Sequence, residues 1–578
     1  MIETDVLIVG SGPAGSSAGL ALSTYGIPNV IVTKYGWLAD TPRAHITNQR
    51  TMEILRDLGV EREVAAKASP QHIMGNAVFC TSLAGEELGR LRMWGTEPRR
   101  QADCTLASPC SMCDMPQNLL EPIILGAAAE RGTKVRLNSE YISSRQDAEG
   151  VTAEVKDRVS SETYKIRAKY LLGADGANSK VAEDAGLPFE GKMGVAGSIN
   201  IVFRCDLGKY VEYRPSVLYW VLQPGSDVGG VGMGVIRMVR PWNEWLAIWG
   251  YDLAAGAPQL TGAAAEAIVR NLIGDQNIPL QIRSTSLWTV NDMYATRYST
   301  GRVFCMGDAV HRHPPMNGLG SNTSIQDAYN LAWKLAFVLK GKASPALLDT
   351  YDEERVPIGR QIVKRANKSI GETGPIFEAL GLEPGIEVAQ MWQNMQARKD
   401  ATPQAAAQRE NLRKAILQKN YEFNTHGVEL NQRYRSAAVI PDGTPEPSFE
   451  RDAELYFHPT TWPGARLPHV WLQKDGRPIS TLDIAGSGRF VLLTGIGGEG
   501  WIEAARKASA AHGIAIDGFV IGPGRDLTDL YGEWAEAREI GESGCLLVRP
   551  DAHVGYRATG AADEKHRLSA AVARILGR

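Results

Sequence analysis

The first strand-like stretch, residues 4–9, ends in a continuous apolar run, Val6-Leu7-Ile8-Val9, and glycines follow directly at 10, 12 and 15. A short apolar run of this kind predicts a buried parallel strand, and the small and apolar residues 16–22 predict a helix after it. Gly10 permits a tight turn, Gly12 lets backbone N–H groups approach a pyrophosphate, and Gly15 allows close helix–strand packing. The pattern predicts a dinucleotide site at the positive end of that helix.

The next apolar run, residues 30–33, predicts a second strand of the same sheet. In dinucleotide-binding folds this strand ends in an acidic residue that binds the ribose hydroxyls. Here it ends in Lys34, whose ammonium can donate to ribose or phosphate oxygens but cannot accept from a hydroxyl. The substitution affects the expected ribose contact and leaves the pyrophosphate contact unchanged.

Two later strands also end in a glycine–aspartate pair. Residues 168–173 lead into Asp175-Gly176, and residues 302–306 lead into Gly307-Asp308. Because open α/β sheets bind ligands at the carboxyl edge of their strands, these carboxylates can hydrogen-bond sugar or ribityl hydroxyls. A loop over 311–322 follows, and the helix expected over 324–335 directs its N-terminus to the same place.

Residues 190–295 read as a sheet. Apolar runs at 217–222 and 232–239 flank a turn predicted at 224–227. Aromatic and arginine side chains concentrate in this region, namely Trp220, Arg237, Trp242, Trp245 and Trp288. As core residues they would need no function, but a sheet laid over a flavin is also where an aromatic substrate would be held.

Polar residues precede two expected helices. Arg43, His45 and Gln49 lie before a helix whose apolar face ends at Gly59. Asp114 opens a second helix, which carries Gln117 in its first turn. A solvated loop and a helix N-cap are the purely structural interpretations of these residues.

The C-terminal part differs in composition. Residues 385–430 are rich in Ala, Gln and Arg and predict exposed helix or linker, and a new unit starts near residue 440. This unit contains a second G-x-G-x-x-G at 495–500, but Glu499 within the turn would repel a pyrophosphate. We therefore expect that turn to be structural.

Length and net charge limit the number of domains and the kinds of binding partner that we expect. A chain of 578 residues exceeds one hydrophobic core, so two to four domains are expected. A net charge of −3 and the lack of a long apolar run argue against nucleic acid and membranes as partners. The first strand begins at once, which leaves no room for a signal peptide and predicts a cytoplasmic protein.

Seven cysteines, an odd number, do not suggest a disulfide framework. Cys110 and Cys113 form a C-x-x-C, but a proline precedes the pair and Asp114 follows it, so nothing there stabilises a thiolate. A second cysteine pair for zinc is missing, and no metal site is expected.

The N-terminal G-x-G-x-x-G, Asp175-Gly176 and Gly307-Asp308, in this order, resemble the single-component (class A) FAD-dependent phenol hydroxylases over the whole chain. The segments 42–51 and 307–326 add to the similarity. The resemblance implies an α/β and α+β fold with a doubly wound FAD-binding domain, an inserted mixed-sheet substrate domain and a thioredoxin-like tail. The implied boundaries are 1–72, 111–185 and 296–395 for the discontinuous FAD domain, 73–110 and 186–295 for the substrate domain, 396–439 for a helical linker, and 440–578 for the tail.

The resemblance also implies an activity. It predicts ortho-hydroxylation of a substituted, chlorinated phenol to a catechol in aromatic degradation, with O2 and NAD(P)H, NADPH favoured, through a C4a-hydroperoxyflavin. A bulkier phenol such as 2-hydroxybiphenyl is the alternative substrate, and a homo-oligomer, dimer or tetramer, is implied. A flavin halogenase or epoxidase and a non-catalytic prenyl-binding escort protein on the same scaffold are the other candidates.

The implied chemistry assigns roles to residues. The distal oxygen of the implied peroxide is electrophilic, and a phenolate attacks it more readily than a neutral phenol, whose pKa is ~10. A base at the phenol oxygen is therefore useful. By resemblance, His45 and Asp114 lie near that oxygen, Arg43 lines the flavin and Arg237 the reductant's approach, while Trp220, Trp288 and Met316 wall the ring pocket. The cofactor residues implied are Gly10, Gly12, Pro13, Ala14, Gly15, Lys34, Arg43, Gln117, Asp175, Gly307, Asp308, Gly318, Leu319, Gly320 and Asn322.

Overall fold

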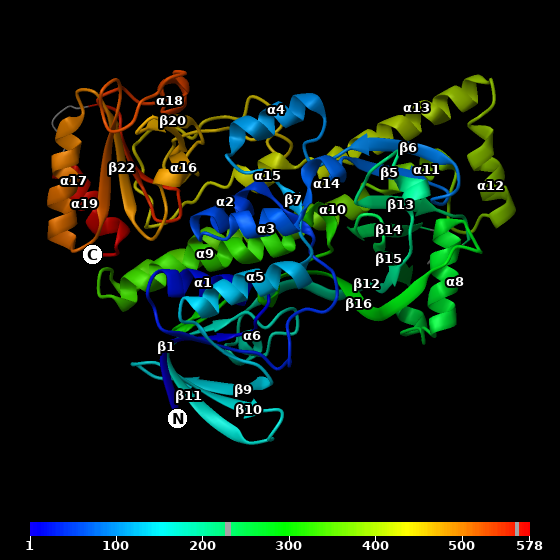
Figure 1. The fold of residues 1–578 in the computed structure, drawn as a ribbon, viewed down its shortest axis with the longest axis horizontal. Helices are drawn as coiled ribbons and strands as arrows, with labels where there is room; N and C mark the ends of the chain where they lie inside the picture. Colours follow the sequence, from blue (N-terminus) through cyan, green and yellow to red (C-terminus); the bar gives the residue numbers. More distant parts are fainter. Residues whose placement is uncertain (226–232, 561–565) are drawn as a thin grey trace.

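The computed structural model describes residues 1–225, 233–560 and 566–578, so the second half of the turn expected at 224–227 lies outside the described residues. Three bodies of mixed α/β structure make up the chain (Figure 1). One contains the N-terminal sheet, one a second large sheet, and one the C-terminal residues in orange and red. The predicted fold class is confirmed.

The first sheet is doubly wound. Its central strands are all parallel in the order β18-β11-β1-β2-β8, with β1 (Ile2–Val9), β2 (Asn29–Val32), β8 (Lys134–Arg136), β11 (Thr163–Gly173) and β18 (Val303–Cys305). The strands β17 (Ser299–Thr300), β10 (Val151–Asp157) and β9 (Ser139–Gln146) extend it in antiparallel fashion. The carboxyl-terminal ends of β1 and β11 and most of β2 and β18 are apolar and buried because helices cover the sheet, whereas the edge strand β8 has the sequence Lys-Val-Arg.

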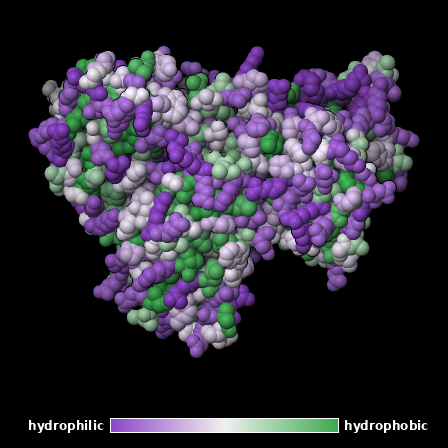
Figure 2. Space-filling view, viewed as in Figure 1, coloured by the Kyte–Doolittle hydropathy of each residue, from purple (hydrophilic) through white to green (hydrophobic). Residues whose placement is uncertain are grey.

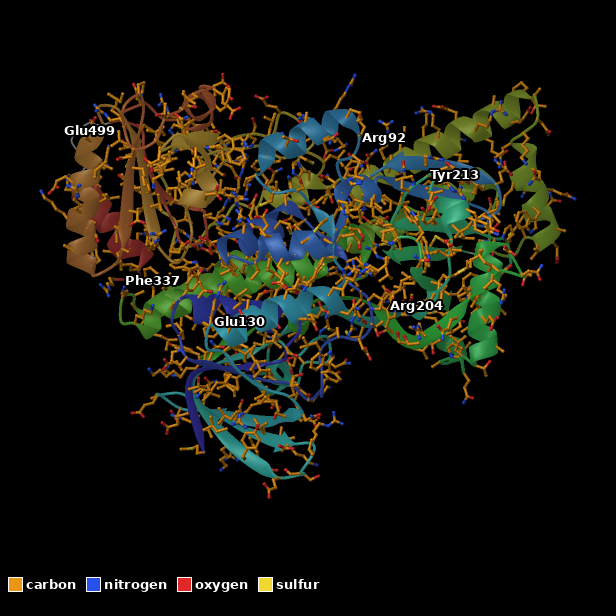
Figure 3. The ribbon with its side chains drawn as sticks, in the orientation of Figure 1. Arg92, Glu130, Arg204, Tyr213, Phe337 and Glu499 are labelled. Carbon is orange, nitrogen blue, oxygen red and sulfur yellow. The ribbon has the colours of Figure 1, made fainter. Side chains whose placement is uncertain are left out.

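Three helices pack together beside this sheet: α1 (Pro13–Thr24), α5 (Gln117–Glu130) and α9 (Gly320–Leu339). The helix α9 begins four residues before the predicted start at Ser324, so the glycine-containing loop runs directly into it. Its far end reaches the C-terminal body, where the ring of Phe337 lies 5.7 Å from that of Phe490 (Figure 3).

The second sheet has eight strands in the order β19-β16-β12-β15-β14-β13-β5-β6. Their bounds are β5 (Asn76–Cys80), β6 (Glu87–Arg92), β12 (Phe189–Arg204), β13 (Leu218–Leu222), β14 (Met233–Arg240), β15 (Glu244–Tyr251), β16 (Gln281–Ala295) and β19 (His311–Arg312). The helix α8 (Gly262–Ile273) packs on this sheet. Since β19 pairs here, residues 311–312 add a strand from outside the proposed substrate-domain range.

The expected linker is helical but not exposed throughout. The helices α12 (Val388–Ala397) and α13 (Pro403–Gln418) pack on the second sheet through Met391, Met395 and Leu412. Their outer surface is mostly hydrophilic at the upper right of Figure 2. The prediction of an exposed segment is therefore wrong for one face of each helix.

The C-terminal body has a four-stranded mixed sheet, with β22 (Phe490–Gly495), β23 (Ile516–Ile521), β24 (Cys545–Val548) and β25 (Val554–Ala558), and the helices α17 (Glu499–His512) and α19 (His566–Ile575). It fits the predicted thioredoxin-like tail. A Cβ on Gly495 would collide with the carbonyl of Glu542, and Gly497 has φ +83°, so packing and backbone conformation explain two glycines of the second G-x-G-x-x-G.

The remaining helices are α2 (Gln49–Asp57), α3 (Glu61–Lys67), α4 (Pro98–Ala107), α6 (Lys180–Asp184), α7 (Gly208–Val211), α10 (Thr350–Gly371), α11 (Gly374–Leu380), α14 (Asn420–Phe423), α15 (His426–Leu430), α16 (Thr481–Ile484) and α18 (Glu533–Ala537). The remaining strands are β3 (Ile46–Thr47), β4 (Ser69–Pro70), β7 (Cys113–Asp114), β20 (Trp471–Lys474) and β21 (Arg477–Ser480). No helix in the described ranges combines the length and apolar character that a membrane span requires.

Candidate active site

The glycine-rich turn after β1 has the geometry of a phosphate site. Gly10 has φ +106°, and a Cβ there would collide with the carbonyl of Ala174. A Cβ on Gly12 would meet only Glu121 Oε1, at 3.9 Å, so space is open there. The helix α1 starts with Pro13 and has no side-chain cap, which leaves backbone N–H groups such as that of Ala14 available to a pyrophosphate.

The Gly307-Asp308 pair lies beside this turn. Gly307 has φ +64°, and a Cβ there would lie 2.7 Å from Ser324 Oγ and 3.2 Å from Ala14 Cβ. The exposed Asp308 carboxylate makes no hydrogen bond within the described part of the chain, so it can accept from ribityl hydroxyls. These features of the structure fit FAD.

Gln117 and Arg43 meet at the start of α5. The backbone N–H of Gln117 donates to the carbonyl of Arg43 at 2.9 Å, and its side-chain amide donates to Glu121 Oε1 at 2.5 Å. Since Glu121 Oε1 also lies beside Gly12, both residues border the turn, as the cofactor assignment requires. Burial raises the pKa of the Glu121 carboxyl.

Some predicted cofactor side chains have protein partners instead. The Asp175 carboxylate accepts from Ser179 Oγ at 2.5 Å and from the backbone N–H of Val181. Asn322 is 1% exposed, and its amide donates to the carbonyls of Ile46 and Gly318 and accepts from the backbone N–H of Asn48. Both ends of the side-chain amide are therefore used within the protein, so its cofactor role, which stays a prediction, could involve only its backbone.

Leu319 buries its side chain in a small apolar cluster with Ile358 and Ile362, so only its backbone can face a cofactor. Gly320 opens α9, whose N-terminus also has no side-chain cap. Lys34 is exposed at the end of β2. The cofactor roles of these residues stay predictions.

Two short strands bring the predicted catalytic pair together. In the antiparallel pairing of β3 with β7, Ile46 lies opposite Asp114, and His45 Nδ1 is 3.2 Å from Asp114 Oδ1. Asp114 belongs to β7 and the N-cap of α5 is Pro116, so the expectation that Asp114 starts the helix is wrong. The N-cap of α2 is Asn48 rather than His45. Neither predicted catalytic residue is therefore a helix cap.

Arg237 completes the group. Its Nη2 lies 2.7 Å from Asp114 Oδ2, and Asp114 is fully buried. The sequence interpretation placed this guanidinium at the reductant's approach. The structure instead commits one of its terminal nitrogens to the Asp114 carboxylate, because the two chain segments meet face to face.

Burial and the neighbouring charges set the ionisation of this group. Burial, the largest influence, and the Arg237 charge lower the pKa of His45, although Asp114 opposes them. Burial alone would raise the pKa of Asp114, but Arg237 and His45 lower it overall. At neutral pH the structure therefore holds a neutral imidazole beside an ionised carboxylate.

The tautomer follows from the partners. A carboxylate only accepts, so His45 Nδ1 carries the proton and Nε2 carries a lone pair. Among the residues that the structure describes, this Nε2 is buried without a hydrogen-bond partner, as are Arg237 Nε and Trp220 Nε1. Buried polar atoms are normally paired, so these three point to a polar ligand at the site.

The register of the second sheet gathers the aromatic residues on one face. Trp220 lies opposite Phe79 and Val235, and Arg237 is two residues beyond Val235, so all share a face. Across β15 and β12 the same face carries Asn200, which accepts a hydrogen bond from the Trp288 indole at 3.0 Å. Trp220, Arg237 and Trp288 therefore share the face that meets Asp114.

Trp245 of β15 lies on the opposite face of the sheet. Trp245 is fully buried, packs against Tyr219 at 6.2 Å and donates its indole N–H to Cys205. Trp245 is therefore a core residue whose indole N–H has a hydrogen-bond partner, and it needs no further function.

The loop before α9 packs against β3, the strand that directly follows His45. A Cβ on Gly318, which has φ +63°, would lie 2.9 Å from Ile46 Cβ, and Met316 packs on the same apolar cluster as Trp220 and Ile46. The predicted ring-pocket residues Trp220 and Met316 therefore border one cluster next to His45.

Two further groups escaped sequence reasoning. Asp327 in α9 accepts from Arg355 Nε at 2.7 Å and the backbone N–H of Gly307 at 3.1 Å, and its Oδ2 lies 2.8 Å from His311 Nε2. This buried network supports the Gly307-Asp308 turn. No local spacing reveals it, because its members come from separate elements.

The second group lines a small hollow near Trp94 and Phe423, whose rings lie 5.7 Å apart. Glu429 borders it, is 5% exposed, and has a carboxyl with no partner in the described ranges. Burial raises the pKa of Glu429 to about 8.

The fold and the site define an FAD-binding oxidoreductase with an aromatic pocket. The family described as "FAD binding domain" matches residues 3–366, and the family described as "Aromatic-ring hydroxylase, C-terminal" matches residues 460–578. The chain belongs to these FAD-dependent aromatic-ring hydroxylases and is a monooxygenase. The resemblance stated from the motifs is confirmed, and a non-catalytic escort protein is excluded.

Particular relatives are similar over their full length. The chain is 60% identical to 2,4-dichlorophenol 6-monooxygenase of Delftia acidovorans, covering 100% of this chain and 98% of that protein. It is 51% identical to phenol 2-monooxygenase of a Pseudomonas species, covering 96% and 90%. The solved structure of the flavin-dependent monooxygenase PieE with FAD and substrate has a TM-score of 0.96 at 45% identity, covering 100% and 99%.

Proposed function

We propose that this protein uses NAD(P)H and O2 to hydroxylate a chlorinated phenol at the ortho position, giving a catechol. The observation that carries the proposal is the buried His45–Asp114–Arg237 group, whose free His45 Nε2 lies beneath the aromatic face of the second sheet. The motif segments 42–51 and 307–326 support it, because they resemble 2,4-dichlorophenol 6-monooxygenase and also 2-hydroxybiphenyl 3-monooxygenase.

His45 acts on the phenol oxygen. Its neutral Nε2 accepts the phenol proton, and the ionised Asp114 stabilises the imidazolium that forms and fixes the tautomer. Arg237 holds Asp114 in place and keeps it ionised. The result is an electron-rich phenolate in the pocket.

The pocket orients the ring and excludes water. Trp220 and Met316 supply apolar surface, and the indole N–H of Trp220 can donate to a ring substituent or hydroxyl. Trp288 closes the same face of the sheet. Excluding water protects the reactive oxygen from unproductive decay.

The cofactor would be held by the turn at 10–15, by Asp308 and by the N-termini of α1 and α9, with Gln117 and Arg43 beside them. When bound, FAD supplies the activation of O2 and the exchange of electrons with NAD(P)H that this class of enzyme uses. We propose NADPH as the preferred reductant and a cytoplasmic location. We also propose that the protein is a dimer or tetramer, and light scattering of the holoenzyme would test this oligomeric state.

The decisive experiment measures NAD(P)H consumption and identifies products over a panel of substituted phenols. We expect chlorinated phenols to give catechols with little peroxide, and NADPH to support a higher kcat/KM than NADH. Faster coupled turnover of 2-hydroxybiphenyl would assign the bulkier substrate. Consumption without any catechol would contradict the proposal.

A further inference from the structure

One arginine of the C-terminal body reaches into the first domain. Arg466 is 3% exposed, and its Nε lies 2.8 Å from Oε2 of Glu53, which is 5% exposed. Its Nη2 also bonds the Glu53 carboxylate and donates to the carbonyl of Ala107 at 2.8 Å. A single guanidinium therefore joins α2, in the range 1–72, to the end of α4, in the range 73–110.

These two segments carry the catalytic pair. Glu53 lies in α2, which begins four residues after His45, and Ala107 ends α4, just before the strand of Asp114. Ser108 tightens the junction, since its Oγ donates to Glu53 Oε1 at 2.6 Å and accepts from the backbone N–H of Cys110 at 3.2 Å.

The ion pair persists at any working pH. Burial alone would raise the pKa of Glu53, but Arg466, together with smaller effects of Arg50 and Ser108, outweighs it and brings the pKa to about 2. The carboxylate is therefore ionised, and the fork of the guanidinium sets its orientation as well as its charge.

Such a junction matters because general-base catalysis depends on geometry. His45 directly precedes β3, which pairs with β7, the strand of Asp114, over two residues, and His45 Nδ1 lies 3.2 Å from Asp114 Oδ1. We propose that Arg466 is a positioning residue: through Glu53 and Ala107 it makes the C-terminal body set the spacing of His45 and Asp114. The inference rests on the proposed function for the role of that pair, and on the structure for the junction itself.

The test compares holoenzyme variants of two buried arginines. Arg466→Met removes the junction. Arg557→Met is the matched control, because Arg557 is 7% exposed and pairs with Asp442 and Glu539 inside the C-terminal body. We expect Arg466→Met to accelerate hydrogen exchange in peptides spanning 45–48 and 113–115, and Arg557→Met to leave them unchanged.

Turnover provides the second readout. Misplacement by about 1 Å can cost roughly 100-fold in rate, so we expect Arg466→Met to lower phenol turnover about 10- to 100-fold and to raise the peroxide fraction. The KM for NAD(P)H should not change, since no contact of Arg466 involves the predicted cofactor residues. Arg466→Lys, which keeps the charge but lacks the fork, should restore the Tm more than the coupling.

A purely structural role predicts a different result. If exchange at 45–48 and 113–115 and the peroxide fraction simply follow the Tm across Arg466→Met, Arg466→Lys and Arg557→Met, the positioning role is wrong. If the wild type hydroxylates no phenol, the proposed function fails, while the exchange comparison still decides whether Arg466 holds the two strands.

Discussion

At the residue scale, His45 is the group on which the chemistry depends. It is a buried, neutral imidazole with one nitrogen on a carboxylate and the other free. Replacing it with alanine removes the base, so we expect hydroxylation to slow by about 10²- to 10⁴-fold with more NAD(P)H lost as peroxide. Stopped-flow turnover with peroxide detection measures both, and His72→Ala, at an exposed histidine, is the control.

The same variant has a chemical rescue. A fluorinated phenol of lower pKa is already partly ionised, so it should recover part of the lost rate in His45→Ala and in Asp114→Ala. In the wild type, protonation of His45 should depress kcat/KM only below the usual histidine pKa of ~6.5, because burial lowers its pKa. Normal coupling in both variants would refute the catalytic assignment.

Glu429 permits a test of stability against pH. Its pKa is raised from 4.5 to about 8 in the folded protein, so the stability linked to its protonation is complete below 4.5 and is lost as pH rises towards 8. The loss is about 1.4 kcal/mol per pH unit within that window. Glu429→Gln should therefore match the wild type near pH 4.5 and exceed its Tm at pH 8.

Thermal melts of the holoenzyme at several pH values measure this difference. Glu63→Gln, at an exposed residue paired with Lys67, is the matched control and should leave the pH dependence unchanged. Melting curves that stay parallel for wild type and Glu429→Gln would show that Glu429 is ionised in the folded protein.

At the scale of elements, a substitution in the turn between β1 and α1 can fill the expected cofactor space without disturbing the fold. A Cβ at Gly12, where φ is −67°, would meet no atom of the described residues closer than 3.9 Å, so we expect Gly12→Val to fold normally. The new side chain would occupy the space that a pyrophosphate needs. We expect the purified variant to have lost most of its flavin absorbance, with an unchanged far-ultraviolet CD spectrum.

Asp308→Ala should weaken flavin retention through a different contact, the acceptor for ribityl hydroxyls. Gly126→Ala serves as control, because a Cβ at that α5 position meets nothing within 4 Å and lies within a helix. Should both Gly12→Val and Asp308→Ala purify fully yellow, the cofactor lies elsewhere.

At the scale of the whole molecule, buried ion pairs join the C-terminal body to the first domain. Arg549, fully buried, pairs with Glu354 of α10, which also pairs with Lys334 of α9 at 2.8 Å. Removing Arg549 would leave Glu354 with one cation fewer in the protein interior. We expect Arg549→Met to destabilise the protein by about 3–5 kcal/mol.

Denaturant titration measures that loss. Arg489→Met is the comparison, because the Arg489–Asp517 pair is about half-exposed and such pairs contribute ~0–1 kcal/mol. Equal effects of the two substitutions would mean that the junction contributes nothing beyond a surface ion pair. The same junction argues against removing residues 440–578 as a test of domain function.

Local sequence patterns determined the elements and the cofactor turn. The apolar run before Gly10, the end of α2 two residues before Gly59 and the strand at 76–80 follow from periodicity and turn residues, which act between near neighbours along the chain. The motifs also selected the residues of the site, because the cofactor requires particular residue types at particular spacings.

Only the tertiary structure decided how those residues meet. Asp114 lies 69 positions after His45, and Arg237 lies 123 positions after Asp114. Their contacts depend on the pairing of β3 with β7 and on the face of the sheet to which Arg237 of β14 belongs. Asn322 was assigned to the cofactor, yet packing of α9 against β3 uses its amide in the protein. Arg466 had no local signal at all. Such contacts depend on how separate elements pack, and spacing along the chain does not encode that.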